Sequence, residues 1–547
     1  MTTKINYYTS FIGILMLLGS CAKIDGYLDK AETGGMTEDQ VFAAYVQAEQ
    51  FLANVYAQLP SEYAVQYSAA TDEATASIKN SPEGKMMELQ FTPSTSSSYY
   101  RWEELYEAIR RVNIFLKNAD RIPVINIDQE AGKPRMIGEA HFLRAFFYAE
   151  LFKRYGGVPL ILEPLTIQQD MNIPRNPVEE VVAFIQNECD LAINLLPVKY
   201  TSADLGRATK GAALTLKART LLYAASALHN PSNDLEKWKI AADAAREVIE
   251  LKEYSLHNNY KLLFHTRISS EIIFQHTINY TTYTSEFIPV SLGGKRTYFN
   301  PLQNLVDDYE MLNGERPVLS YNPDDTPVIN PKAGYDPQKP YENRDPRFYM
   351  SILYNGSSWR NSPIFTYSGA PNDGIGSGRN ITGYFFCKML DETAYTTPTV
   401  RNGNNYWIFM RYAEVLLNYA EAQNEYLDVP DQSIYDAINE IRRRPGVTMP
   451  DIPVGLSKDE MRERIRHERR IELAFESHRF WDIKRWQISE DVLKAAYGMM
   501  ATKQPDGSFE YKPFLAEKRN IPEYYDLFPI PQSVINRNAG LEQNPGY

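Results

Sequence analysis

Two groups of amphipathic helical patterns, separated by a long block without helical periodicity, constrain the fold of this chain more than any other feature. The first group lies before residue 258 and the second after residue 405. The block between them is rich in Gly, Pro, Asn, Ser, Tyr and Thr and holds short β-type runs such as EIIFQHTINY. A segment this long without regular helices, inside a helical protein, is often functional. The pattern predicts a mainly α fold that carries a loop-rich region with short strands.

The helical patterns place apolar and Ala positions on one face. In the stretch RWEELYEAIRRVNIFLKNA these positions are Trp102, Leu105, Ile109, Val112 and Leu116. Comparable patterns cover residues 135–157, 177–197, 206–228, 237–251, 409–426 and 433–444. Successive patterns with aromatic and Ala positions indicate helix-turn-helix pairs that pack like tetratricopeptide repeats. Because their spacing is irregular, a regular solenoid is not expected.

The first residues are typical of an export signal. A short apolar run from Phe11 to Leu18 follows a single Lys and is too short to span a bilayer. The next residues, up to Cys21, complete a Leu-Gly-Ser-Cys sequence that resembles a bacterial lipobox. This resemblance implies cleavage before Cys21 and its acylation, and several acyl chains give durable anchoring to a membrane. An ordinary secretion signal with a chance Cys is the alternative.

Charge and cysteine content exclude several classes of protein. The formal net charge is -12, which argues against nucleic acid as the main partner, because phosphate binding requires a basic face. Besides Cys21, only Cys189 and Cys387 are present, too few for a disulfide framework in so long an exported chain. Cys189 lies in a helical pattern, where we expect a small buried apolar residue.

Motifs for catalysis and for metal binding are incomplete. His467-Glu468 begins like a zinc-protease motif, but Ile471 stands where the second His ligand is required. The glycine run at residues 374–378 lacks the flanking strand and helix of a dinucleotide-binding loop. A carboxylate pair for glycoside hydrolysis stays open, since the separation of two carboxylates is a three-dimensional property. We expect no cofactor and no dedicated metal site; an irregular Ca²⁺ site stays open, although no EF-hand loop is present.

The charged stretch IRHERRIELAFESHRFWDIKRW, residues 465–486, is predicted as one helix that is buried on one side. Its apolar stripe consists of Ile471, Ala474, Phe475, His478 and Trp481. Its charged face carries Glu468, Glu472 and Glu476, with Arg464, Arg469 and Arg479 at helical spacings that allow pairing. We interpret these charges as structural, satisfied by each other and by nearby loops, rather than as catalytic.

Seven stretches between the lipobox and the C-terminus carry a family resemblance. They are FLRAFFYAELFKRYGGVPLI, GAALTLKARTLLYAASAL, NRDPRFYMSILYNG, FMRYAEVLLNYAEA, INEIRRRPGV, the charged stretch 465–486 and LFPIPQSVINRNAGLEQNPGY. In this order they resemble the SusD/RagB family of nutrient-binding outer-membrane lipoproteins from Bacteroidetes. The resemblance divides the chain into a lipoprotein signal peptide (1–20), an N-terminal SusD-like helical region with tetratricopeptide-like pairs (21–257), a loop-rich ligand-binding region (258–405) and a C-terminal RagB/SusD helical region (406–547).

The resemblance implies a non-catalytic role beside a partner, a SusC-like TonB-dependent transporter barrel. In such pairs the lipoprotein acts as a lid that captures ligand at the cell surface and closes it into the barrel. Most ligands in the family are glycans or oligosaccharides, and some members take peptides. The implied location is the outer membrane, with a lipid anchor at Cys21 and the protein facing the cell exterior. Surface-exposed members usually carry an acidic run after the Cys, whereas this chain has only Asp25 and Asp29 beside Lys23.

A glycan site requires exposed aromatic rings that stack on sugar faces, beside polar groups that bind hydroxyls. Three stretches meet this requirement. Their candidate ligand-binding residues are Tyr67 and Asp72, with Tyr63 nearby, then Tyr280 and Tyr283, and finally Trp359, Arg360 and Asn361. Trp359 is the strongest candidate, because its neighbours are small and polar and show no core pattern. Ordinary packing is the alternative for each Tyr, and Trp102, Trp238, Trp481 and Trp486 are expected in the core.

Four functions therefore stand side by side. The leading one is a cell-surface glycan-binding lipoprotein, and the second is a peptide-binding, RagB-like member of the same scaffold. A secreted glycosidase would require an essential carboxylate pair and turnover of a glycan. A structural adaptor of the outer membrane would have a partner barrel but no soluble ligand.

Overall fold

The computed structural model describes residues 36–547 except 61–63, 79, 81–83, 86–91, 95–98, 167, 202–203, 277, 279, 281–282, 295–296, 378, 394, 397–398 and 401–404. The predicted signal peptide, Cys21 and Tyr63 lie outside the described residues. Across the part of the chain that is described, no helix is long and apolar enough to cross a membrane. The prediction of a mainly α fold with short strands is confirmed.

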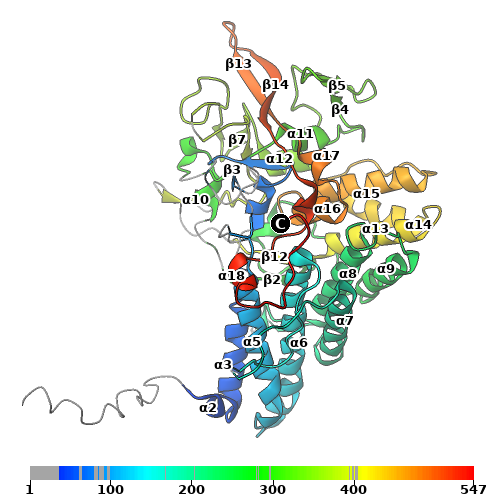
Figure 1. The fold of residues 1–547 in the computed structure, drawn as a ribbon. Coiled ribbons are helices and arrows are strands. Elements are labelled where there is room, and N and C mark those ends of the chain that lie inside the picture. The colour runs from blue at the N-terminus through cyan, green and yellow to red at the C-terminus, as the bar shows by residue number, and fades with distance from the viewer. Residues whose placement is uncertain are drawn as a thin grey trace, which may run out of the picture.

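Helices packed in chain order form the body of the molecule (Figure 1). Helix α5 packs on α6, α6 on α7, α7 on α8 and α8 on α9, and α13 returns from far along the chain to lie against α8 and α9. The long helices are α3 (Tyr45–Tyr56), α5 (Trp102–Asn118), α6 (Ile127–Tyr155), α7 (Val178–Leu195), α8 (Lys210–Ala225), α9 (Leu235–Glu250), α13 (Tyr412–Tyr426), α14 (Gln432–Arg442) and α15 (Lys458–Glu472). The short ones are α2 (Glu38–Phe42), α10 (Tyr283–Phe287), α11 (Gln303–Asp308), α12 (Pro346–Ser351), α16 (His478–Arg485), α17 (Ser489–Leu493) and α18 (Gln532–Ile535).

Caps and small residues explain where these helices lie. The Asn126 side chain accepts a hydrogen bond from the backbone N of Gln129 and starts α6. Gly156, with φ 73°, ends it in a conformation that favours glycine. Inside α6, a Cβ on Gly138 would lie 2.8 Å from the Cβ of Leu195, so this glycine permits the close approach of α7.

The strands, which come from the loop-rich region and from segments before and after it, pair two by two in the described residues, always antiparallel. The longest pair, β13 with β14, forms a hairpin that projects at the end of the molecule opposite to α2 (Figure 1). The pairs are β1 (Ala74–Ala76) with β3 (Phe299–Pro301), β2 (Ile272–Gln275) with β12 (Ile408–Arg411), β4 (Val318–Tyr321) with β5 (Pro327–Ile329), β6 (Ile352–Leu353) with β9 (Phe385–Phe386), β7 (Ser358–Trp359) with β8 (Ser362–Pro363), β10 (Tyr395–Thr396) with β11 (Thr399–Val400), and β13 (Ala495–Lys503) with β14 (Phe509–Lys518).

The molecule has two large apolar cores, one in the helical body and one in the loop-rich region. The first core fills the helical body, and the second core, which includes Tyr283, Phe386 and Phe475, fills the loop-rich region. The predicted burial of Cys189 is confirmed. So is that of Trp102, Trp238, Trp481 and Trp486, all of which are buried.

The stretch 465–486 is not one helix, and that prediction is wrong. Helix α15 ends at Glu472, and α16 begins at His478. Between them Phe475 and Ser477 have φ of 64° and 69°, a left-handed conformation that a continuous helix excludes. Glu476 therefore lies in the turn and not on the helical face of Glu468 and Glu472.

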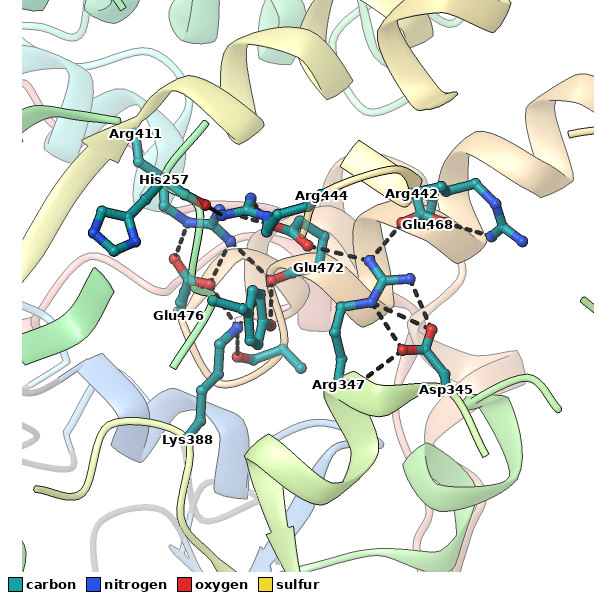
Figure 2. Close-up of polar contacts among 12 residues, drawn as sticks. His257, Asp345, Arg347, Lys388, Arg411, Arg442, Arg444, Glu468, Glu472 and Glu476 are labelled. Atoms are coloured by element: carbon teal, nitrogen blue, oxygen red, sulfur yellow. Dashed lines mark hydrogen bonds and ion pairs between the residues drawn. The ribbon is translucent and has the colours of Figure 1, made fainter. Parts of the chain in front are cut away.

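A buried ion network joins α15 to the loop-rich region, and Glu472 is at its centre (Figure 2). Glu472 Oε1 accepts hydrogen bonds from Arg411 and Arg444 at 2.7 Å each. Its Oε2 accepts one from Arg347 at 3.1 Å. These arginines come from α12, from the end of β12 and from the segment after α14, so three separate elements converge on one carboxylate.

The other two glutamates of the stretch extend the network. Glu468 binds Arg347 at 2.5 Å and Arg442 at 2.8 Å. Glu476 binds Arg411 at 2.6 Å and Lys388 at 2.7 Å. The charges are thus satisfied by ion pairs, as predicted, but the predicted partners are wrong. Arg464, Arg469 and Arg479 instead pair with Glu310, Asp482 and Asp72.

Replacing Glu472 by Gln should destabilise the fold, because Arg411 and Arg444 would lose a shared carboxylate in a buried site. Breaking such a pair typically costs about 3–5 kcal/mol. Urea unfolding followed by circular dichroism measures the loss. The exposed Glu490, replaced in the same way, serves as the control and should cost less than about 1 kcal/mol. Equal midpoints for the two variants would contradict the central role of Glu472.

The network also predicts an acid dependence of stability. Burial alone would raise the pKa of Glu472, but the Arg444, Arg411 and Arg347 guanidiniums outweigh it and lower this pKa from 4.5 to about 2. Since the folded pKa lies below the unfolded one, the stabilisation is fully present above pH 4.5 and is lost as the pH falls towards 2. Urea midpoints across this window should therefore fall less steeply in Glu472→Gln than in the parent chain.

Candidate functional site: an aromatic row on the loop-rich region

A row of aromatic rings crosses the loop-rich region. Centroids of neighbouring rings lie between 4.2 and 6.3 Å apart. The members of this aromatic row are, in spatial order, Phe365, Tyr367, Phe509, Tyr511, Tyr341, Tyr354 and Tyr349. They come from three chain segments that the fold brings side by side.

Strand geometry and two amide side chains hold the row in place. Phe509 and Tyr511 are two residues apart on β14, so their side chains share one face of the strand. Gln338 pins the backbone of Tyr511, because its Oε1 accepts from the Tyr511 N at 3.0 Å and its Nε2 donates to the Tyr511 O at 3.2 Å.

Asn355 connects the row from behind. Its buried side chain accepts hydrogen bonds at Oδ1 from the backbone N of Thr366 and Tyr367, at 3.1 and 3.2 Å. Its Nδ2 donates to the Tyr511 hydroxyl at 3.3 Å. One side chain thereby fixes the segment that carries Phe365 and Tyr367 against the strand that carries Tyr511.

The aromatic row is partly open to solvent. Phe365 and Tyr349 are 42% and 39% exposed, and the rings between them are half-buried. Burial raises the pKa of Tyr354 to about 12, so its hydroxyl stays neutral near pH 7 and can both donate and accept. Flat apolar faces beside hydroxyl groups suit a ligand whose rings have an apolar face and a polar edge.

Trp359 is not part of this surface. Its side chain is 1% exposed and packs in the second core, with the Lys261 Nζ 5.2 Å from the ring centroid. Arg360 and Asn361 form the two-residue turn between β7 and β8, have positive φ and are both exposed. The expectation of an exposed indole is wrong, because small polar neighbours mark a tight hairpin turn here and the strand directs the ring inward.

The other sequence candidates are dispersed. Tyr67 is buried between Tyr99, Phe480 and Trp481, and Arg154 donates to its hydroxyl at 2.9 Å. Asp72 is buried and pairs with Arg470 at 2.6 Å.

Tyr283 lies in α10 within the second core, with Trp359, and Tyr280 is partly exposed against that core. The expected exposure of Tyr67, Asp72 and Tyr283 is therefore wrong. A role for any of the seven candidates in ligand binding stays a prediction.

Sequence reasoning missed the aromatic row, although one signal for it existed. The alternation Phe509-x-Tyr511 is typical of a strand with one aromatic face. Its partners Tyr341 and Tyr367 could be found only from the fold. Among the described residues, no three His, Cys, Asp or Glu side chains are grouped so as to hold a metal ion.

Comparison with known families identifies the fold. A sequence model described as the SusD family matches residues 270–547, more than half of the chain. The chain belongs to the SusD family. A second model, described as starch-binding associating with outer membrane, matches residues 26–222.

Individual relatives agree with the SusD family over nearly the whole chain. The SusD-like protein P38 of Formosa agariphila is 25% identical over 528 residues, which cover 89% of this chain and 92% of the relative. A solved SusD-like protein from Bacteroides fragilis is 29% identical with a TM-score of 0.79, covering 93% of this chain and 99% of that protein. A SusD-like carbohydrate binding protein from the same species is 28% identical with a TM-score of 0.77, covering 92% and 100%.

Replacing Trp359 by Ala tests whether its side chain packs in the second core. Trp359→Ala should lower the free energy of unfolding by about 3–5 kcal/mol, because a buried indole leaves a cavity. Phe365→Ala, at an exposed ring of the aromatic row, is the control and should change stability by less than about 1 kcal/mol. Chemical denaturation of both variants measures the difference, and an unchanged Trp359→Ala variant would argue against a core position.

Proposed function

We propose that this chain captures glycans at the cell surface and delivers them to a SusC-like TonB-dependent transporter, without catalysing a reaction. The aromatic row is the observation that carries the proposal. Its seven rings follow one another as neighbouring ring pairs, and the two rings at its ends are exposed. A linear oligosaccharide repeats apolar ring faces and hydroxyl edges in the same manner, so several sugar units can stack at once.

The comparisons support the same class of ligand. The family model on residues 26–222 is described as starch-binding and as associating with the outer membrane. One structural relative at 28% identity is named a carbohydrate binding protein. Membership of the SusD family supports a transporter partner and a binding surface outside the cell, and the lipobox at Cys21 supports a lipid anchor in the outer membrane.

Calorimetric titration of the chain begun after Cys21 tests this function. Against a panel of neutral polysaccharides and their oligosaccharides, we expect heat with one glycan class and no product on chromatography. Phe365→Ala and Tyr367→Ala should each weaken the affinity about tenfold, which corresponds to about 1.4 kcal/mol. The control is Tyr524→Ala, since Tyr524 is 43% exposed but packs on Tyr547, outside the aromatic row.

Three results would count against the proposal. Equal affinities in all three variants would remove the aromatic row from the binding site. Glycan products would contradict a non-catalytic role. Heat with peptides but not with glycans would favour a peptide-binding, RagB-like member, whose affinity rests on backbone contacts rather than on single rings.

A further inference from the structure

A cleft of about 540 Å³ lies beside α15 and α17 and shares no lining residue with the aromatic row. We call it the guanidinium cleft, because five arginines line it. They are Arg316, Arg464, Arg466, Arg470 and Arg479, and the indole of Trp486 adds an aromatic wall. The formal net charge of the whole chain is -12, so this concentration of cations is a local feature.

Two buried aspartates of the cleft are shared among three of its arginines. Asp72 pairs with Arg470 at 2.6 Å and with Arg479 at 2.8 Å. Asp308 pairs with Arg470 at 2.5 Å and also with Arg316. Each of these three guanidiniums is therefore already paired with a carboxylate, and Arg464 pairs with Glu310 at 3.2 Å. Glu315, Glu463 and Asp491 also line the cleft, so its five carboxylates equal its five arginines in formal charge, and an anion has to bind at an arginine that has no ion pair.

Arg466 is the exception among the cleft arginines. Its guanidinium stacks on the Trp486 ring, 4.6 Å from the centroid. Within the described residues it has no carboxylate at ion-pair distance, whereas each of the other four cleft arginines has one. A desolvated charge without a partner is costly, so this side chain is poised to bind an anion.

The buried network around Glu472 shows what a satisfied arginine looks like in the same protein (Figure 2). Arg442 there contacts both Glu310 and Glu468, at 2.8 Å each. Arg444 contacts both Glu271 and Glu472, at 2.7 Å each. Arg466 lies on the same helix α15 as Glu468 and Glu472, yet it points to the cleft without such a partner.

We propose that the guanidinium cleft binds the anionic group of an acidic glycan, either a carboxylate or a sulfate ester. The planar guanidinium fork matches the geometry of an oxyanion, which it can bind through two parallel hydrogen bonds. Arg466 provides guanidinium donors that no carboxylate engages, and Trp486 offers its indole at the same cleft. This inference rests on the proposed function, because it names the chemical class of the captured glycan.

The ion pairs of the cleft determine which arginine can be replaced without destabilising the fold. Neutralising Arg470 or Arg479 would leave Asp72, whose pKa these guanidiniums hold well below its usual range against the effect of burial, without full compensation. Arg466→Gln leaves no carboxylate unpaired, so the variant should fold. Arg443 is the control, since its exposed side chain pairs with the exposed Asp451 outside the cleft, and its replacement leaves no buried carboxylate unpaired.

Calorimetry with three probes tests the proposal: a carboxylated oligogalacturonate, a sulfated chondroitin oligosaccharide and a neutral malto-oligosaccharide. We expect one acidic probe to bind the parent chain more tightly than the neutral one. Arg466→Gln should weaken that binding about tenfold, and Arg443→Gln less than about twofold. Affinity for the acidic probe should also fall between low and high salt, whereas affinity for the neutral probe should not.

Each other outcome separates this proposal from the proposed function. Binding of the neutral probe alone would leave the proposed function standing and overturn the guanidinium cleft as a glycan site. Acidic binding that Arg466→Gln leaves intact, or that both variants weaken equally, would also overturn it. Absence of heat with all three probes, in a chain folded by circular dichroism, would count against both.

Discussion

The carboxylate of Glu472 is the interaction on which the arrangement of this molecule depends. Burying charges is costly, and only multiple ion pairs with good geometry offset that cost. Glu472 meets the condition by binding arginines from α12, from β12 and from the segment after α14. Removing any one of these elements would leave Glu472 in the interior without one of its ion-pair partners. The network therefore selects one placement of the loop-rich region on the helical body, while the two apolar cores supply most of the favourable burial.

Local pattern predicted most of the long helices, but it predicted neither the break between α15 and α16 nor the partners of the ion network. Spacing alone predicted that Trp102 and Trp238 face the core, because a helix buries residues three and four apart whatever lies opposite. It also suggested that Glu468, Glu472 and Glu476 pair with arginines of their own helix and with nearby loops. Their partners are remote: Arg347 is 125 residues from Glu472. The turn at Phe475 was equally invisible, since no Gly or Pro marks it and surrounding contacts impose its left-handed φ.

Local sequence pattern was also insufficient to locate the candidate site. Small polar neighbours made Trp359 look like an exposed platform, but those residues build a two-residue hairpin turn, and the indole fills the second core. The aromatic row instead assembles from three separate segments, with Asn355 bonded to Tyr511 across 156 residues. Composition could indicate that the loop-rich region has many tyrosines. Only the pairing of its segments determines which of them form one surface.

Helix α15 connects the buried network to the guanidinium cleft. Glu468 and Glu472 are four residues apart and face the network, while Arg466 and Arg470 are also four residues apart and line the cleft. A helix is stiff over this length, so the ion pairs on one face fix the position of the guanidiniums on the other. The structural charges of the stretch 465–486 thus position its remaining arginines for a ligand. Loss of Glu472 would change the position of the cleft guanidiniums by altering the orientation of α15, without any contact between Glu472 and that ligand.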